Sequence, residues 1–369
     1  MPTIEAVPAL PVRPSLGAQP QHCNFLYDPV ALEAVARGDT RRGRFRDLLE
    51  ERRFLAPALI SPAVVFIVLL VGVPLGLSVY LSLTDATAGS LSGRWVGLHN
   101  FVDAWHNDNF RRALRNTIIF TLASQAIVVV GAGLLAHALI RPFRGRWIVR
   151  FLILLPWAAP VALSTIGFLW IFDSQFSVVN WTLVHDLMPG HGHFYLYKPV
   201  NWLLGVVDHL PWVHVGKIDQ FNPPQWIGQP TLAMISIIAV QAWRILPFAT
   251  VIFLAGLASI PPEVEDAATV DGATGLRKFW YVTLPLQLPI AIVTLLFGIV
   301  FTATDMTVVY VLTNGGPFNS TQVLTTWAYQ TGIVSSSLGE GAAVSLFLLP
   351  LLVVVAVLML RFARKVEVA

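Results

Sequence analysis

Six long apolar runs constrain the fold of this chain more than any other feature of its sequence. A helix needs roughly 20 mainly apolar residues to cross the hydrocarbon core of a bilayer, and each run reaches about that length. Charged residues make up 12% of the chain, about half of their usual share in a soluble domain. The sequence therefore predicts an all-α integral membrane protein with about six transmembrane helices, at residues 55–83, 117–140, 148–172, 231–257, 284–312 and 341–362.

Several of these predicted spans contain prolines, namely Pro74, Pro156, Pro160, Pro247 and Pro350. A proline inside a helix frees a backbone carbonyl, and within a bilayer this is tolerated only where neighbouring helices or water satisfy that group. The pattern therefore favours a helix bundle around a polar pathway over a simple membrane anchor.

The distribution of arginine and lysine predicts the orientation of the chain, because short cytoplasmic segments carry an excess of both. Arginine-dense segments occur at residues 41–53, 141–150 and 361–365, while the loop 173–230 contains only Lys198 and Lys217. Both termini are therefore predicted to be cytoplasmic and the loop 173–230 extracytoplasmic. Residues 1–53 form a predicted cytoplasmic extension, disordered over 1–24 and with a basic helix along the inner membrane surface over 28–53.

One part of the chain does not follow this rule. Arg111, Arg112 and Arg115 precede the second predicted span and would lie outside. We expect them to form a short surface helix with Asp103 and Asp108.

A charged segment of about twenty residues, Glu265 to Pro285, separates two apolar runs. Pro261 and Pro262 suit a first helical turn, and the acidic residues that follow face the positive end of the helix dipole. Two glycines then permit a reversal of the chain before a second helix. The small alanines beside the carboxylates would let the surface of a partner approach closely.

This segment resembles the EAA loop of ABC importer permeases, through "DAATVDGA" at residues 266–273, Phe279 and "TLPLQLP". The supporting motifs are "NFVDAWHNDNFRRALRNT", "LLPWAAP", "AWRILPFATVIFLAGLASIPP" and "VVYVLTNGGPFNSTQVLTTWAYQT". Together they cover the chain from about residue 54 to its end and are most similar to the sugar-permease branch, which includes the maltose permease. The resemblance implies the type I importer permease fold in a bacterial inner membrane, with a cytoplasmic coupling loop at residues 259–285.

In that family the coupling loop docks into a groove of the ATPase subunit. By resemblance, the residues that couple to the ATPase are Glu263, Glu265, Asp266, Ala267, Ala268, Asp271, Gly272, Ala273 and Phe279. The first position of the Glu-Ala-Ala motif is aspartate here, which leaves open whether Asp266 or Glu265 makes the salt bridge to the ATPase.

The sequence lacks a G-x-x-x-x-G-K-[ST] phosphate loop, so a separate ATPase is expected to bind ATP and Mg²⁺. We expect this chain to carry no cofactor and not to be an enzyme. Six spans form half of the family's usual twelve-helix pathway, which implies a second permease subunit. An extracytoplasmic binding protein would deliver the substrate, and no nucleic acid partner is expected.

The resemblance also indicates where a sugar would bind. Trp157, Trp243 and Phe248 match aromatic positions of the substrate site, and Thr302 and Asp305 match positions that bond sugar hydroxyls. A carboxylate within a span costs about 2.5–3.5 kcal/mol, which makes Asp305 a functional candidate by default. Its alternative role is an ion pair with Arg244, and both roles are compatible if the pair lines the cavity. A negative charge there would also disfavour an anionic substrate such as a glycerol phosphate.

Two further features do not indicate a site. The histidines at 185, 191, 193, 209 and 214 have irregular spacing without an H-E-x-x-H pattern, and the single cysteine, Cys23, has no partner, so no metal site is expected. The glycine-rich "TNGGPFNST" is interpreted as a turn at the external end of the pathway.

The predicted function is import of a di- or oligosaccharide by an ATP-driven transporter, of which this chain is the permease. The alternatives are a permease for glycerol phosphate or another small polyol, an intramembrane enzyme, and a self-contained secondary transporter.

Overall fold

The computed structural model describes residues 52–90, 92–185, 196–207 and 223–368, and all of its named elements are helices. The chain divides into two compact units, residues 1–72 and 73–369, which are described separately. In the first unit, α2 (Arg52–Ile67) continues into the π-helical turn η1 (Val68–Gly72). Its side chains from Leu59 to Gly72 are exposed within the chain, as expected of a helix whose partner is lipid or another subunit. Most of the predicted N-terminal extension lies outside the described residues.

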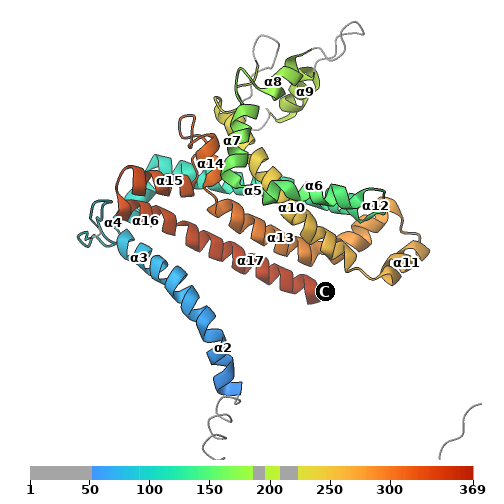
Figure 1. Cartoon of the computed structure of the whole chain (residues 1–369), viewed down its shortest axis with the longest axis horizontal. Helices are drawn as coiled ribbons and strands as arrows, with labels where there is room; N and C mark the ends of the chain where they lie inside the picture. Colours follow the sequence, from blue (N-terminus) through green and yellow to red (C-terminus); the bar gives the residue numbers. More distant parts are fainter. Residues whose placement is uncertain (1–51, 91, 186–195, 208–222, 369) are drawn as a thin grey trace, which may run out of the picture. The chain divides into compact units, whose positions relative to one another are not determined.

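The second unit is a helix bundle (Figure 1). It consists of α3 (Val73–Ser82), α4 (His99–His106), α5 (Asp108–Ile140), α6 (Arg146–Ala158), α7 (Val161–Ile171), α8 (Val178–Val184), α9 (Tyr197–Val207), α10 (Pro230–Ala258), α11 (Pro262–Val270), α12 (Gly275–Lys278), η2 (Phe279–Thr283), α13 (Leu284–Thr304), α14 (Thr307–Leu312), α15 (Leu324–Tyr329), η3 (Gln330–Val334), α16 (Leu338–Leu346) and α17 (Leu348–Val368).

Five helical runs among the described residues are long and apolar enough to cross a membrane. They are Leu59–Ser82, Asp108–Ile140, Pro230–Ala258, Gly275–Thr304 and Leu338–Arg364. The pair α6 and α7 provides a sixth crossing if the two helices are counted as one broken span. The predicted all-α membrane fold with about six spans is therefore confirmed.

The prediction of one continuous helix over 148–172 is wrong, because α6 and α7 are bent by 96° at Ala159–Pro160. Proline disfavours the helical conformation of the residue before it, and Ala159 is extended, with a ψ of 142°. Pro160 then begins α7 as its N-cap residue.

The prediction of one helix over 284–312 is also wrong. Helix α13 ends at Thr304, Asp305 is extended with a ψ of 126°, and α14 begins at Thr307. Asp305 therefore lies at a break between two helices, where its carboxylate can bond the free end of the second one.

The second span begins earlier than predicted, at Asp108. The side chain of Asn107 caps this helix by accepting a hydrogen bond from the Asn109 backbone N–H at 2.9 Å. Arg111, Arg112 and Arg115 consequently lie in the first turns of α5 and not in a separate surface helix.

Helices α5 and α10 run in the same direction through the centre of the bundle. Ala132 and Ala136 of α5 pack with Ala242 and Ala249 of α10, and such small residues let two membrane helices approach closely. The same cluster joins the end of α5 to the segment after α10. We call this the α11 end of the bundle, and Figure 1 places α11, α12 and the end of α17 there.

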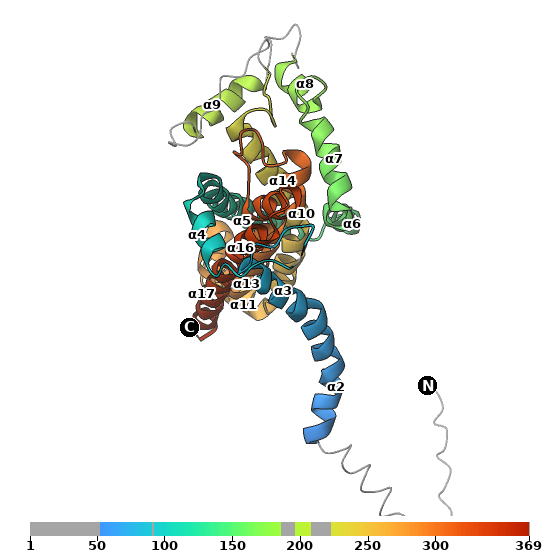
Figure 2. The same ribbon diagram turned by 90° about the vertical axis from the view of Figure 1, so that its left-hand side faces the viewer.

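The opposite end, called the α4 end, contains the beginning of α5. Phe110 and Ala113 pack there with Leu324 of α15 and Val344 of α16. Figure 2 looks at the bundle from this end, with α6 and α7 on the other side of it from α4.

Candidate functional site

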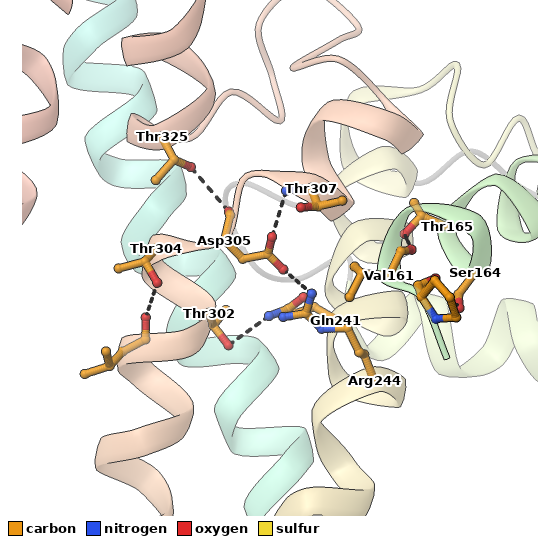
Figure 3. A network of polar contacts seen from close by, with 12 residues as sticks. Val161, Ser164, Thr165, Gln241, Arg244, Thr302, Thr304, Asp305, Thr307 and Thr325 are labelled. Carbon is orange, nitrogen blue, oxygen red and sulfur yellow. Dashed lines mark hydrogen bonds and ion pairs between the residues drawn. The ribbon is translucent and has the colours of Figure 1, made fainter. Parts of the chain in front are cut away.

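An ion pair lies in the interior of the bundle (Figure 3). Arg244 of α10 approaches Asp305 with an Nη1–Oδ2 distance of 2.5 Å, and their side chains are 14% and 8% exposed. The contact is one of charge, because Asp305 Oδ2 accepts no geometrically aligned hydrogen bond within the described residues. Asp305 Oδ1 accepts a hydrogen bond from the Thr307 backbone N–H at 2.7 Å, which satisfies a donor freed by the helix break.

The ion pair that the sequence left as one alternative is therefore present. Because Arg244 neutralises the carboxylate, the charge of Asp305 gives no reason to disfavour an anionic substrate.

Thr302 lies one turn before Asp305 and is fully buried. Its hydroxyl oxygen accepts hydrogen bonds from Gln125 Nε2 at 2.8 Å and Gln241 Nε2 at 3.2 Å, which joins α13 to α5 and α10. A Cβ atom on Gly298 would lie 2.0 Å from Gln125 Oε1, so glycine is needed there to admit the amide. In this conformation the Thr302 hydroxyl is therefore occupied by the amides of Gln125 and Gln241.

Three aromatic side chains form a row beside the ion pair. Trp157 stacks on Phe248 with ring centroids 5.6 Å apart, and Phe248 contacts Phe301 edge-to-face at 6.1 Å. We call Trp157, Phe248 and Phe301 the aromatic row. Trp157 is 53% exposed and Phe301 is 48% exposed, so the row presents ring surface outside the packed core.

Trp243 does not belong to this row. It contacts Phe168 of α7 edge-to-face at 5.0 Å, and it remains partly exposed. Sequence reasoning thus identified two members of the row and missed Phe301.

Helical spacing explains why the ion pair and the aromatic row are neighbours. Phe248 lies four residues after Arg244 on α10, and Phe301 lies four residues before Asp305 on α13. Residues four apart share a helix face on successive turns. The signal that would have revealed Phe301 was therefore its spacing from Asp305. Gln125 and Gln241 were also missed, although amides within apolar spans commonly bond across helices.

The segment at the α11 end forms a helix, a glycine turn and a second short helix. Gly272 has a φ of +75°, and the Ala273 N–H donates to Ala268 O at 2.8 Å across the turn that ends α11. This is a Schellman-type ending, in which glycine adopts the left-handed conformation without a steric penalty. Ala268 is buried, whereas Glu263, Glu265, Asp266, Ala267, Asp271 and Gly272 are exposed.

The two carboxylates that the sequence could not separate differ in their partners. Glu265 forms an ion pair with Lys278, with an Oε2–Nζ distance of 3.0 Å. The Asp266 side chain makes no hydrogen bond or ion pair with the residues that the structure describes. Phe279 lies edge-to-face against His137 of α5 at 5.2 Å, which connects this loop to the bundle.

Within the described residues, no group of three or more histidine, cysteine, aspartate or glutamate side chains is placed to hold a metal ion. His185 stacks on Trp181, with ring centroids 4.4 Å apart. The histidines at 191, 193, 209 and 214 lie outside the described residues.

The described residues therefore form a bundle of apolar helices with a buried ion pair, an exposed aromatic row and a helix–glycine–helix loop at one end. The family model described as "Binding-protein-dependent transport system inner membrane component" matches residues 129–368. The chain belongs to this family, and it is the multi-pass permease subunit of an ABC importer. The predicted family, fold class and permease function are confirmed.

Individual relatives support the same assignment. The chain is 29% identical to the sulfoquinovosyl glycerol transport system permease protein SmoG of Agrobacterium fabrum, over 85% of this chain and 91% of that protein. It is 27% identical to the sn-glycerol-3-phosphate transport system permease protein UgpA of the same organism, over 85% and 96%. A solved bacterial ABC transporter involved in import of the acidic polysaccharide alginate has a chain of similar fold, with a TM-score of 0.65, 19% identity, and coverage of 87% and 99%.

Proposed function

We propose that the chain translocates a di- or oligosaccharide inward, after delivery by an extracytoplasmic binding protein. The observation that supports this proposal most directly is the aromatic row beside the Arg244–Asp305 pair. Sugars present apolar ring faces that stack on aromatic side chains, while their hydroxyls accept and donate hydrogen bonds. A flat aromatic surface next to a guanidinium and a carboxylate supplies both kinds of contact.

The residues proposed to contact the sugar are Trp157, Phe248 and Phe301 through stacking, and Arg244 and Asp305 through hydrogen bonds. Trp243, which packs against α7, would contact the sugar through the exposed part of its ring. Thr302 becomes a ligand only if Gln125 and Gln241 release its hydroxyl, since it is fully buried here. We therefore assign Thr302 to the closed packing of the three helices in this conformation.

Import of a glycerol phosphate is a second candidate, favoured by the similarity to UgpA and by the neutral ion pair. Glycerol phosphate has no sugar ring, so its transport would not depend on stacking. The dependence of uptake on the aromatic row therefore separates the two substrates.

The loop at the α11 end is proposed to couple the permease to an ATPase subunit that binds ATP and Mg²⁺. Val270 and Leu276 in this loop are 87% and 78% exposed, which supports docking against another protein. Asp266 is the carboxylate proposed to bond the ATPase, because Glu265 is engaged by Lys278. This chain would then perform no catalysis itself.

The same loop is proposed to lie in the cytoplasm, together with both termini. The α11 end carries Arg277 and Lys278, and the arginine-dense connection between α5 and α6 reaches the same end. A second permease subunit would complete the pathway against the exposed side of the aromatic row.

Uptake of a panel of labelled saccharides and of glycerol 3-phosphate into proteoliposomes tests this proposal. Trp157→Ala and Phe248→Ala are expected to raise the half-saturating saccharide concentration about tenfold each, since an aromatic contact contributes about 0.5–1.5 kcal/mol beyond area burial. Trp170→Ala, which removes an exposed tryptophan of α7, is the matched control. Glycerol 3-phosphate uptake that is unaffected by all three changes would favour the second candidate.

A further inference from the structure

The segment between α14 and α15 presents an exposed aromatic side chain in an unfavourable backbone conformation. Phe318 is 87% exposed and has a φ of +53°. A bulky residue with positive φ is uncommon, and such strain persists only where the surroundings impose it. Asn314 and Asn319 share the left-handed conformation, with φ values of +48° and +56°.

Contacts with the start of α5 impose this conformation. Asn116 Nδ2 donates to Ser320 O at 2.8 Å and to Gln322 O at 3.0 Å. Arg112 Nη1 donates to Phe318 O at 2.9 Å. The segment is also closed on itself by the Thr313–Thr321 hydroxyl pair, at 2.7 Å. The contacts hold the backbone of residue 318 while its ring projects into solvent.

The same turns of α5 carry three arginines that lie close together on the proposed outer side, where the positive-inside rule disfavours them. All three are exposed. Arg111 is paired with Asp108, Arg112 binds the Phe318 carbonyl, and the side chain of Arg115 has no hydrogen-bond or ion-pair partner among the described residues. A cluster of positive charges on the side where the rule disfavours them indicates a use other than topology.

We propose that Arg111, Arg112, Arg115 and Phe318, which we call the arginine–phenylalanine surface, dock an acidic patch of the extracytoplasmic binding protein. The inference rests on the proposed orientation, in which the α4 end faces outward. Arginine and aromatic residues are enriched at protein interfaces, and a positive surface steers a negative partner toward it. Phe318 would be the buried anchor of the contact. The arginines would attract the acidic patch of the binding protein and fix its position on the permease.

The phosphates of lipid headgroups are the other anionic partner available at a membrane surface. Lipids adapt to any exposed apolar side chain, so contact with them requires no fixed backbone around Phe318. A protein surface does require a fixed geometry, and the braced, strained segment therefore favours a protein partner.

The test uses the complete transporter in nanodiscs, assembled from this chain and its proposed second permease and ATPase, together with the proposed solute-binding protein. The measurement is the binding-protein concentration that half-maximally stimulates ATP hydrolysis. Phe318→Ala is expected to raise this concentration about tenfold or more, with the maximal and basal rates unchanged. Arg115→Glu is expected to raise it several-fold, and more strongly at low salt, since screening weakens exposed charges.

Arg94→Glu is the matched control, because Arg94 is an exposed arginine of the loop between α3 and α4 that lies outside this surface. It is expected to leave the half-maximal concentration unchanged. Arg115→Lys retains the charge and is expected to restore most of the affinity.

Wild-type values for both Phe318→Ala and Arg115→Glu would overturn the proposal while leaving the proposed function intact. Stimulation of ATP hydrolysis could instead depend on the content of anionic lipid, and Arg115→Glu could remove that dependence at every concentration of binding protein. This result would assign the arginine–phenylalanine surface to lipid and would also overturn the proposal. If the wild-type transporter shows no stimulation by the binding protein, the proposed function itself fails.

Discussion

Replacement of Asp305 by alanine perturbs two interactions at once. The buried guanidinium of Arg244 loses its carboxylate, and the Thr307 N–H loses its acceptor. Removal of one partner of a buried ion pair costs about 3–5 kcal/mol, and loss of a hydrogen bond adds about 1 kcal/mol. We expect Asp305→Ala to destabilise the folded bundle by about 4–6 kcal/mol, and hence to reduce the amount of assembled transporter.

This loss alone cannot separate a structural role from sugar binding, so the informative variant removes both charges. In Arg244→Met/Asp305→Leu no unpaired charge remains, and replacement of a buried pair by apolar residues is often neutral or stabilising by about 1–4 kcal/mol. The double variant should therefore recover assembly. It should still fail to take up sugar, because the two groups proposed to bond its hydroxyls are absent.

The assay measures four quantities on each variant: the amount of assembled complex by size-exclusion chromatography, the midpoint of thermal unfolding, basal ATP hydrolysis and sugar uptake. Asp305→Asn is the control, since it keeps an acceptor for the Thr307 N–H and removes only the charge. Wild-type uptake by the double variant would refute a role of the pair in sugar binding. A double variant as unstable as Asp305→Ala would refute the energetic reasoning.

Three further changes test other parts of the structure. Gly298→Ala places a Cβ atom 2.0 Å from Gln125 Oε1 and should destabilise the bundle by about 1–3 kcal/mol, measured by thermal unfolding, with recovery when Gln125→Ala is added. Asp266→Ala should reduce sugar-stimulated ATP hydrolysis at least tenfold and Glu265→Ala less, and equal effects would contradict the assignment of Asp266 as the ATPase contact. A cysteine placed at Gly145, with the native cysteine replaced, should react only with a reagent on the cytoplasmic side, and external labelling would reverse the orientation.

The family and the number of spans were predictable because they depend on apolar length and on short motifs, which survive local irregularities. The break within the third span had a signal in Pro160, since the residue before a proline avoids the helical conformation. The size of the bend, 96°, had no signal in the sequence, because it is set by how the two helices pack.

The break at Asp305 was not predictable from local sequence. Thr304 to Met306 contains neither proline nor glycine, and the extended residue is stabilised by contacts with Arg244 and Thr307, which lie on other helices. The ion pair, by contrast, was foreseeable, because two opposite charges within apolar spans have few other partners.

The site was predictable only in part, for a related reason. Trp157 and Phe248 were recognised by motif, but Phe301 belongs to no motif and joins the row through its packing on Phe248. The burial of Thr302 under Gln125 and Gln241 also required three helices to be placed together.

The central claim is that this chain carries a saccharide as one part of an ATP-driven importer, and transport by the purified parts tests it most directly. Labelled saccharide uptake is measured in proteoliposomes with ATP on the cytoplasmic side and binding protein on the other. We predict uptake only when this chain, the second permease, the ATPase, ATP and binding protein are all present, and loss of uptake when any one is omitted. Sugar transport by this chain without the ATPase would contradict the account.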